Sequence, residues 1–237
     1  MKNLLSLCIW LLVTPFVYSQ DLIGAWTWIE TGDEGGQVKG VVTFTQGYQV
    51  AAWFDAKTGN FIRTNGGTWN LDGNTMTEVA EFNSEDPEKV GKEVSFEIEW
   101  NGTDKMRIVG MDTWAERVDD GEPGALAGAW LISARKRNGD LQPINTLRPR
   151  KTMKILSGTR FQWVAYNVAT KQFMGTGGGT YTTVDGKYTE NIEFFSRDNS
   201  RVGASLEFNY AIEEGDWQHS GKNSRGEPLF EIWTQRD

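Results

Sequence analysis

The chain has 237 residues, a net charge of −8 at pH 7, one cysteine and one histidine. The negative charge argues against nucleic acid as a partner, and no motif typical of nucleic-acid binding is present. The one cysteine, Cys8, falls in a segment that we expect to be removed. Disulfides, thiolate catalysis and cysteine-ligated zinc are therefore excluded from the mature chain.

The first nineteen residues have the pattern of a secretory signal peptide. A basic start at Lys2 is followed by an apolar run over 4–17 and by the small residue Ser19. The apolar run is too short for a spanning helix. We therefore predict a signal peptide over 1–19, a secreted or periplasmic location and no membrane anchor.

The mature sequence favours antiparallel β-sheet. It is rich in Gly, Thr, Trp and Phe and shows no sustained helical period, whereas polar and apolar residues alternate over 94–100 and 205–212. Eleven tryptophans are many for this length. They either pack the core of a small β protein or provide flat platforms for a ligand such as a sugar ring.

An internal repeat organises the chain. "LIGAW" at 22–26 returns as "LAGAW" at 126–130, and the segment 64–82 returns as 176–194 at an offset of 112 residues. Such self-similarity indicates two copies of one unit. We predict one domain over 20–118, a polar linker rich in Gly and Pro over 119–125, and a second domain over 126–237.

Each copy shows about eight short strands separated by turn residues. In the second copy the predicted strands are 129–135, 152–156, 161–167, 179–184, 188–195, 205–212, 217–220 and 229–235. Short Gly, Asp and Asn turns between consecutive strands favour an up-and-down barrel, and an open β-sandwich is the alternative. "TGGGT" at 176–180 lacks the lysine and the helix of a phosphate loop, so its glycines are expected to permit a bulge or a close strand crossing.

The ends of both copies resemble the lipocalin pattern. In that pattern a Gly-x-Trp on the first strand packs with an arginine of the last strand at the closed end. The matching residues are Gly24-Ala25-Trp26 with Arg117, and Gly128-Ala129-Trp130 with Arg236. This resemblance implies two tandem lipocalin-like barrels. More broadly the chain is similar to small lipocalin-like proteins that Bacteroidota secrete, often encoded among polysaccharide-degrading enzymes.

The two copies differ in charge. The segment 21–124 has 20 acidic and 8 basic residues, a balance of −12, whereas 125–237 has 12 acidic and 15 basic residues, a balance of +3. Basic runs lie at 134–137 ("ARKR") and 147–154 ("LRPRKTMK"). An anionic ligand would be attracted to the second copy.

Strand alternation predicts a cavity in the second copy. If one face of each strand lines the barrel interior, five side chains converge there: Arg160, Tyr166, Tyr188, Glu190 and His219. Trp217 shares the face of His219, whereas Trp163 is expected outside. The first copy has Tyr48, Phe54 and Met76 in place of Arg160, Tyr166 and Tyr188, and Ile108 or its neighbour in place of His219. Only the glutamates persist, Glu78 with Glu190 and Glu81 with Glu193. We expect a structural role for Glu193, and both a structural and a functional role stay open for Glu190.

The candidate residues form a metal-free acid–base set. No ligand spacing for a metal is visible, and we expect no metal and no cofactor. In the functional interpretation His219 is the general base, Tyr166 or Tyr188 is the acid, and Arg160 pairs with a carboxylate. Glu190 and Trp217 are then substrate contacts, with Trp217 as the stacking ring.

Two functions compete. One is an eliminating enzyme that removes the C5 proton of a uronate and expels a group from C4. In size, signal peptide and acidic repeated β architecture, the chain resembles the secreted dehydratases that marine Bacteroidota use on ulvan oligosaccharides. That resemblance implies an anionic oligosaccharide substrate and a carbon–oxygen lyase activity. The other function is a non-catalytic lipocalin-like binding protein for an oligosaccharide or small ligand. A homodimer stays open in both cases.

Overall fold

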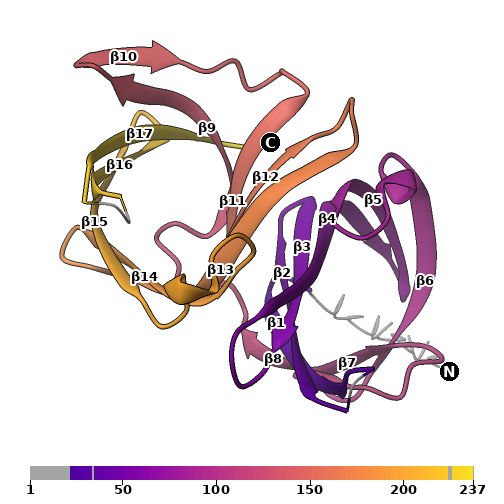
Figure 1. Ribbon diagram of the computed structural model, residues 1–237. Coiled ribbons are helices and arrows are strands. Elements are labelled where there is room, and N and C mark those ends of the chain that lie inside the picture. The colour runs from indigo at the N-terminus through magenta and orange to yellow at the C-terminus, as the bar shows by residue number, and fades with distance from the viewer. Residues whose placement is uncertain (1–21, 34, 224–225, 237) are drawn as a thin grey trace, which may run out of the picture.

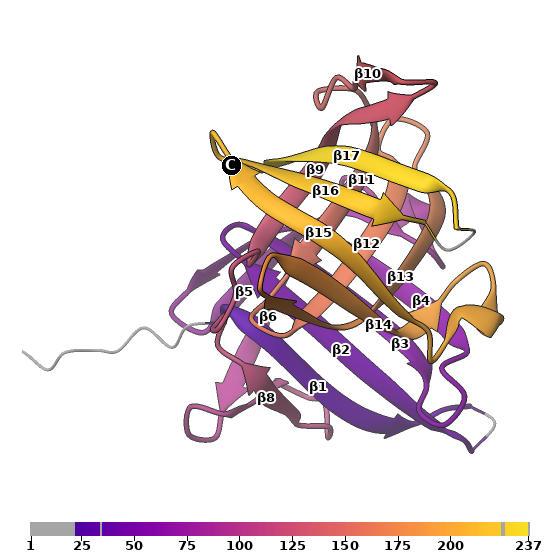
Figure 2. The same cartoon turned by 90° about the vertical axis from the view of Figure 1, so that its left-hand side faces the viewer.

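The computed structural model describes residues 22–33, 35–223 and 226–236, and it consists of two closed antiparallel β-barrels in tandem. Figure 1 shows the barrels side by side, and Figure 2 shows the strands of both from the side. The predicted all-β fold of two lipocalin-like barrels is confirmed. The sandwich alternative is wrong, because in each copy the first strand also pairs with the last.

The first barrel consists of eight strands in which each pairs with the next along the chain and β8 pairs with β1. A single 3₁₀ turn, η1 (Pro87–Lys89), lies between β5 and β6. The strands are β1 (Gly24–Thr31), β2 (Gln37–Thr45), β3 (Tyr48–Asp55), β4 (Phe61–Asp72), β5 (Thr75–Asn83), β6 (Glu93–Trp100), β7 (Lys105–Ile108) and β8 (Ala115–Asp119).

The second barrel has the same order and closes through β9 and β17. All eight predicted strands are present. The additional strand β10 (Asp140–Pro143) forms a hairpin with the end of β9 and was missed because it is short, polar and exposed. The other elements are β9 (Gly128–Arg137), β11 (Arg150–Leu156), β12 (Arg160–Asn167), β13 (Gln172–Val184), β14 (Lys187–Phe195), η2 (Asn199–Arg201), β15 (Ser205–Glu213), β16 (Asp216–Lys222) and β17 (Pro228–Gln235).

The glycines shared by the two copies lie at equivalent bulges. The register shifts between Gly66 and Gly67 in β4, and between Gly178 and Gly179 in β13. A Cβ at Gly179 would overlap the carbonyl oxygen of Asn191, and a Cβ at Gly67 would overlap that of Val79. The expectation of a bulge with close strand approach is therefore confirmed.

The closed ends of the two barrels differ. In the first barrel Arg117 lies opposite Trp26, and its guanidinium stacks 4.1 Å from the indole ring. In the second barrel Gln235 lies opposite Trp130, so Arg236 points out of the barrel. A register difference of one residue reverses the face of a strand residue. The lipocalin-like Arg–Trp packing is therefore found in the first copy alone.

Tyr166 belongs to the interface between the barrels and not to the interior of the second one. Its hydroxyl donates to Glu81 Oε2 at 2.5 Å, and its ring lies 4.9 Å from that of Phe82; both partners are in the first barrel. Arg236 completes the group with a bidentate pair to Glu81 at 2.5 and 2.7 Å. The prediction that Tyr166 lines the cavity is wrong.

Arg160 lies at the same interface. Its guanidinium forms a bidentate pair with Glu193 at 2.7 and 3.0 Å, and Lys39 of the first barrel bonds the same carboxylate at 3.1 Å. Gln162, two residues further along β12, donates to Thr64 of the first barrel. The prediction that Arg160 lines the cavity is also wrong. The structural role expected for Glu193 agrees with these contacts.

The error has a physical cause. Both faces of β12 are buried, one in the barrel interior and the other against the first barrel, so polarity does not reveal which face points inward. Phe161 and Trp163 pack with the interior core, and Trp163, expected outside, is therefore inside. Because side chains alternate strictly, Arg160, Gln162 and Tyr166 point outward.

The segment that joins the barrels is held at its start. Asp119, the last residue of β8, accepts hydrogen bonds from Ser157, Gly158 and Thr159 in the turn between β11 and β12. The end of the first barrel is thus tied to the second by a buried carboxylate.

Candidate functional site

A group of polar side chains lies inside the second barrel, within an aromatic core. It consists of Lys154 on β11, Tyr188 and Glu190 on β14, His219 on β16 and Glu231 on β17, and each is at most 6% exposed. Buried charged groups are costly unless they are paired, so their contacts define what this cluster can do.

His219 and Glu231 form the first part of the cluster. His219 Nδ1 lies 3.4 Å from Glu231 Oε2, which also accepts from Trp233 Nε1 at 3.2 Å. Burial would raise the pKa of Glu231, but the His219 contact and the charges of Lys154 and Arg135 hold it below its usual range. The carboxylate can only accept, so Nδ1 of a neutral imidazole carries the proton.

The surroundings of His219 determine its protonation state. Burial, together with the charge of Lys154, lowers the pKa of His219 below its usual 6.5. The imidazole is therefore neutral at pH 7, and its Nε2 carries a lone pair. Among the described residues Nε2 has no hydrogen-bond partner. A neutral histidine that is oriented by a carboxylate and carries a buried, unpaired Nε2 has the protonation state of a general base.

Lys154, Glu190 and Tyr188 form the second part of the cluster. Glu190 Oε1 accepts from Lys154 Nζ at 2.7 Å and from the Tyr188 hydroxyl at 2.9 Å. Burial and the adjacent charge of Glu190 raise the pKa of Tyr188 well above its usual value, so the phenol stays protonated. The rings of Tyr188 and His219 lie 5.7 Å apart. A base, an acid and a cation are thus neighbours.

Four of the six sequence-predicted residues are brought together. Tyr188, Glu190, His219 and Trp217 lie inside the barrel, whereas Arg160 and Tyr166 do not. Trp217 is fully buried, with the rings of Tyr188 at 5.1 Å and Trp233 at 5.9 Å. Its faces are covered by neighbouring rings, so Trp217 shapes the cluster and does not offer a free platform.

Sequence reasoning missed Lys154 and Glu231. Lys154 lies in the basic run at 147–154, where alternation puts Arg150, Thr152 and Lys154 on one face of β11. Of the two cations on that face, Lys154 lies deeper within the strand, and this position could have indicated it. Glu231 lies opposite His219 in the β16–β17 register, a pairing that the β-hairpin alone could have indicated.

The first barrel lacks this cluster. Strand registers place Val42, Met76 and Ile108 where the second barrel has Lys154, Tyr188 and His219. Glu78 takes the place of Glu190, and without a cation beside it burial raises its pKa to about 7. The acid–base set is thus confined to the second copy.

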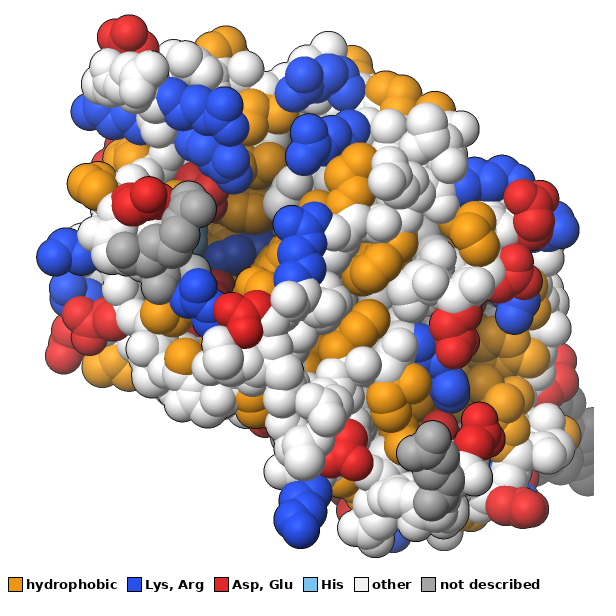
Figure 3. All heavy atoms as spheres, viewed as in Figure 1, with side chains coloured by type: hydrophobic (Ala, Val, Ile, Leu, Met, Phe, Trp, Pro, Cys, Tyr) orange, Lys and Arg blue, Asp and Glu red, His pale blue; other side chains and the backbone are white. Residues whose placement is uncertain are grey.

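The mouth of the second barrel is basic. The two basic runs lie on either side of one cavity of about 350 Å³ between β9, β10 and the start of β11, and Arg135 joins it to the cluster by bonding Glu231 Oε1 at 2.8 Å. Figure 3 shows Lys and Arg side chains grouped around a hollow over this barrel.

Comparison with known proteins adds no family. No protein-family model matches the chain, and no curated protein matches it in sequence. Within the described residues no group of three His, Cys, Asp or Glu could hold a metal ion, and no helix there has the length and apolarity to cross a membrane.

Proposed function

We propose that the second barrel binds an anionic oligosaccharide and eliminates water across C4–C5 of its non-reducing-end uronic acid. The observation that carries the proposal is the His219–Glu231 pair, in which a neutral imidazole with an unpaired Nε2 lies next to a protonated phenol and a cation. These are the groups that elimination beside a carboxylate needs.

Each group has a role in the step. His219 Nε2 takes the C5 proton, and the electrons of that C–H bond form the C4–C5 double bond. The C4–O bond breaks, and Tyr188 donates the proton that completes the leaving water. Lys154, whose Nζ lies 4.9 Å from the Tyr188 ring and whose charge acts on His219, stabilises the charge that develops on the uronate carboxylate, the role that the sequence had assigned to Arg160.

The substrate and the location rest on sequence. The resemblance to ulvan-oligosaccharide dehydratases supports an algal uronate as substrate, and the signal-peptide pattern supports secretion. That pattern, residues 1–19, lies outside the described residues. The cationic mouth supports an anionic ligand independently of both.

A binding protein without catalysis is the second candidate. It is favoured by the burial of the cluster, since a satisfied polar core can also serve stability. The two candidates differ in product, because elimination creates an unsaturated uronate that absorbs in the ultraviolet.

The test is incubation of the mature protein with ulvan oligosaccharides. We expect ultraviolet absorbance to rise and the product mass to fall by one water. Binding detected by calorimetry with no rise in absorbance would leave the binding protein as the function. If neither binding nor a rise in absorbance were detected, both candidates would be contradicted.

A further inference from the structure

The cavity at the mouth of the second barrel has an unusual lining. Its volume of about 350 Å³ is in the range of small-molecule sites. Its thirteen lining residues include five cations and no acid. The cations are Arg135, Arg137, Arg148, Arg150 and Lys151.

The cavity exists because two strands separate. The β9–β11 pairing ends at Leu131 and Met153, and beyond it β9 pairs with β10 instead. The segment 144–149 between β10 and β11 forms the remaining wall. This wall is held by its own bonds, from Lys151 Nζ to Thr146 O at 2.9 Å and from Arg148 Nε to Asn145 O at 3.3 Å.

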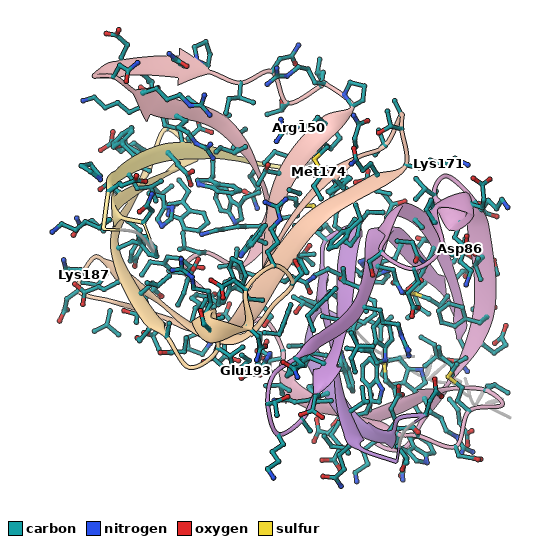
Figure 4. The ribbon with its side chains drawn as sticks, viewed as in Figure 1. Asp86, Arg150, Lys171, Met174, Lys187 and Glu193 are labelled. Carbon is teal, nitrogen blue, oxygen red and sulfur yellow. The ribbon has the colours of Figure 1, made fainter. Side chains whose placement is uncertain are left out.

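The arginines that line the cavity are not all paired with acidic side chains. Arg135 is bonded to Glu231, whereas Arg137 and Arg150 have no ion pair within the described residues. Figure 4 labels Arg150 at the start of β11, and this residue lines the cavity. Like charges around one small cavity repel one another, and an anion within it removes that repulsion. The guanidinium fork fits carboxylate, sulfate and phosphate oxygens.

We propose that this cavity binds an oxyanion group of the ligand other than the uronate that reacts at His219. The preferred ligand then carries at least two anionic groups. His219, Tyr188 and Lys154 do not line this cavity, and the ion pair between Arg135 and Glu231 connects the two places. This inference rests on the proposed function, because it assumes that the reacting uronate and the second oxyanion belong to one oligosaccharide.

The chain offers a matched control in Lys136. It lies between Arg135 and Arg137 on β9 but does not line the cavity, because alternation points it to the other face. Lys136→Gln removes the same unit of charge as Arg137→Gln at nearly the same place. If general surface charge attracts the anion, the two substitutions should weaken anion binding equally. If the cavity binds the anion, Arg137→Gln should weaken binding more than Lys136→Gln.

The experiment is calorimetric titration of the mature protein with inorganic phosphate, with an oligogalacturonate and with a neutral oligosaccharide of equal length. We expect the first two to bind, with affinity falling as salt rises, and the third to bind at least about tenfold more weakly than the oligogalacturonate. Arg137→Gln and Arg150→Gln should each weaken both anions by about tenfold or more, and Lys136→Gln by less than about threefold.

Three results would overturn the inference: no anion binds, Lys136→Gln weakens binding as much as Arg137→Gln, or phosphate binds and the oligogalacturonate does not. His219→Gln separates this inference from the proposed function. Arginine-dependent binding that persists in His219→Gln, without any unsaturated product from wild type, would defeat the proposed function alone. If Arg137→Gln and Arg150→Gln formed product as wild type does, this inference alone would be defeated.

Discussion

His219 shows how the surroundings of a residue determine its protonation state. The same side chain on a surface would be partly protonated near neutral pH. Inside the barrel, burial and Lys154 keep it neutral, and Glu231 fixes which nitrogen carries the proton. The sequence offered His219 as the sole histidine but could not show Glu231 beside it, because that contact depends on the β16–β17 register.

The neutral state of His219 predicts a pH dependence of stability. Its pKa is below 6.5 in the folded protein, so below about pH 6.5 the unfolded chain binds a proton that the folded one does not. Stability is therefore lost as pH falls through this range, by at most about 1.4 kcal/mol per pH unit. His219→Gln lacks this loss.

Urea denaturation of wild type and His219→Gln between about pH 8 and pH 5 checks this sign. The difference in unfolding free energy between the two proteins should shift in favour of the variant as pH falls. A difference that stays constant over the range would show that His219 is not held neutral.

At the scale of elements, alternation and turns were sufficient to predict the strands but not their inward faces. The eight strands predicted in the second copy are all present, because Gly, Asp and Asn punctuate them. The faces of β12 could not be assigned, since Arg160, Gln162 and Tyr166 are as buried as Phe161. A strand covered on both sides has no polar face to read.

The shared glycine bulges make an element-scale prediction. Gly179→Ala places a Cβ against the backbone of β14, so we expect a loss of about 1–3 kcal/mol in unfolding free energy. Gly36→Ala is the control, because a Cβ there meets only Asp55 at 3.8 Å. Equilibrium denaturation measures both, and equal stabilities of the two variants would contradict the role of the bulge.

At the scale of the molecule, the two copies share an architecture but differ in the side chains inside their barrels. The first barrel has a core of large apolar side chains and supports the second through Glu81, Lys39 and Thr64. The second contains the acid–base cluster and the cationic mouth. Duplication was evident from the sequence, whereas the docking of the barrels was not, because it depends on contacts between residues up to 155 positions apart.

A substitution at Tyr166 tests whether this residue serves the docking of the barrels or catalysis. Tyr166→Phe removes one hydrogen bond to Glu81 and should lower stability by about 1–2 kcal/mol while leaving elimination intact. Tyr188→Phe is the matched change inside the barrel and should abolish turnover. Loss of turnover in Tyr166→Phe, with its fold retained by circular dichroism, would return Tyr166 to the catalytic set.

The central claim is that His219 in the second barrel is the base of an elimination reaction. The most direct measurement compares unsaturated-uronate formation by wild type and His219→Gln at equal concentration, with oligosaccharide binding measured in parallel. We predict that the variant binds as wild type does and forms product about 10²- to 10⁴-fold more slowly. Product formed at the wild-type rate by a folded His219→Gln protein would contradict it.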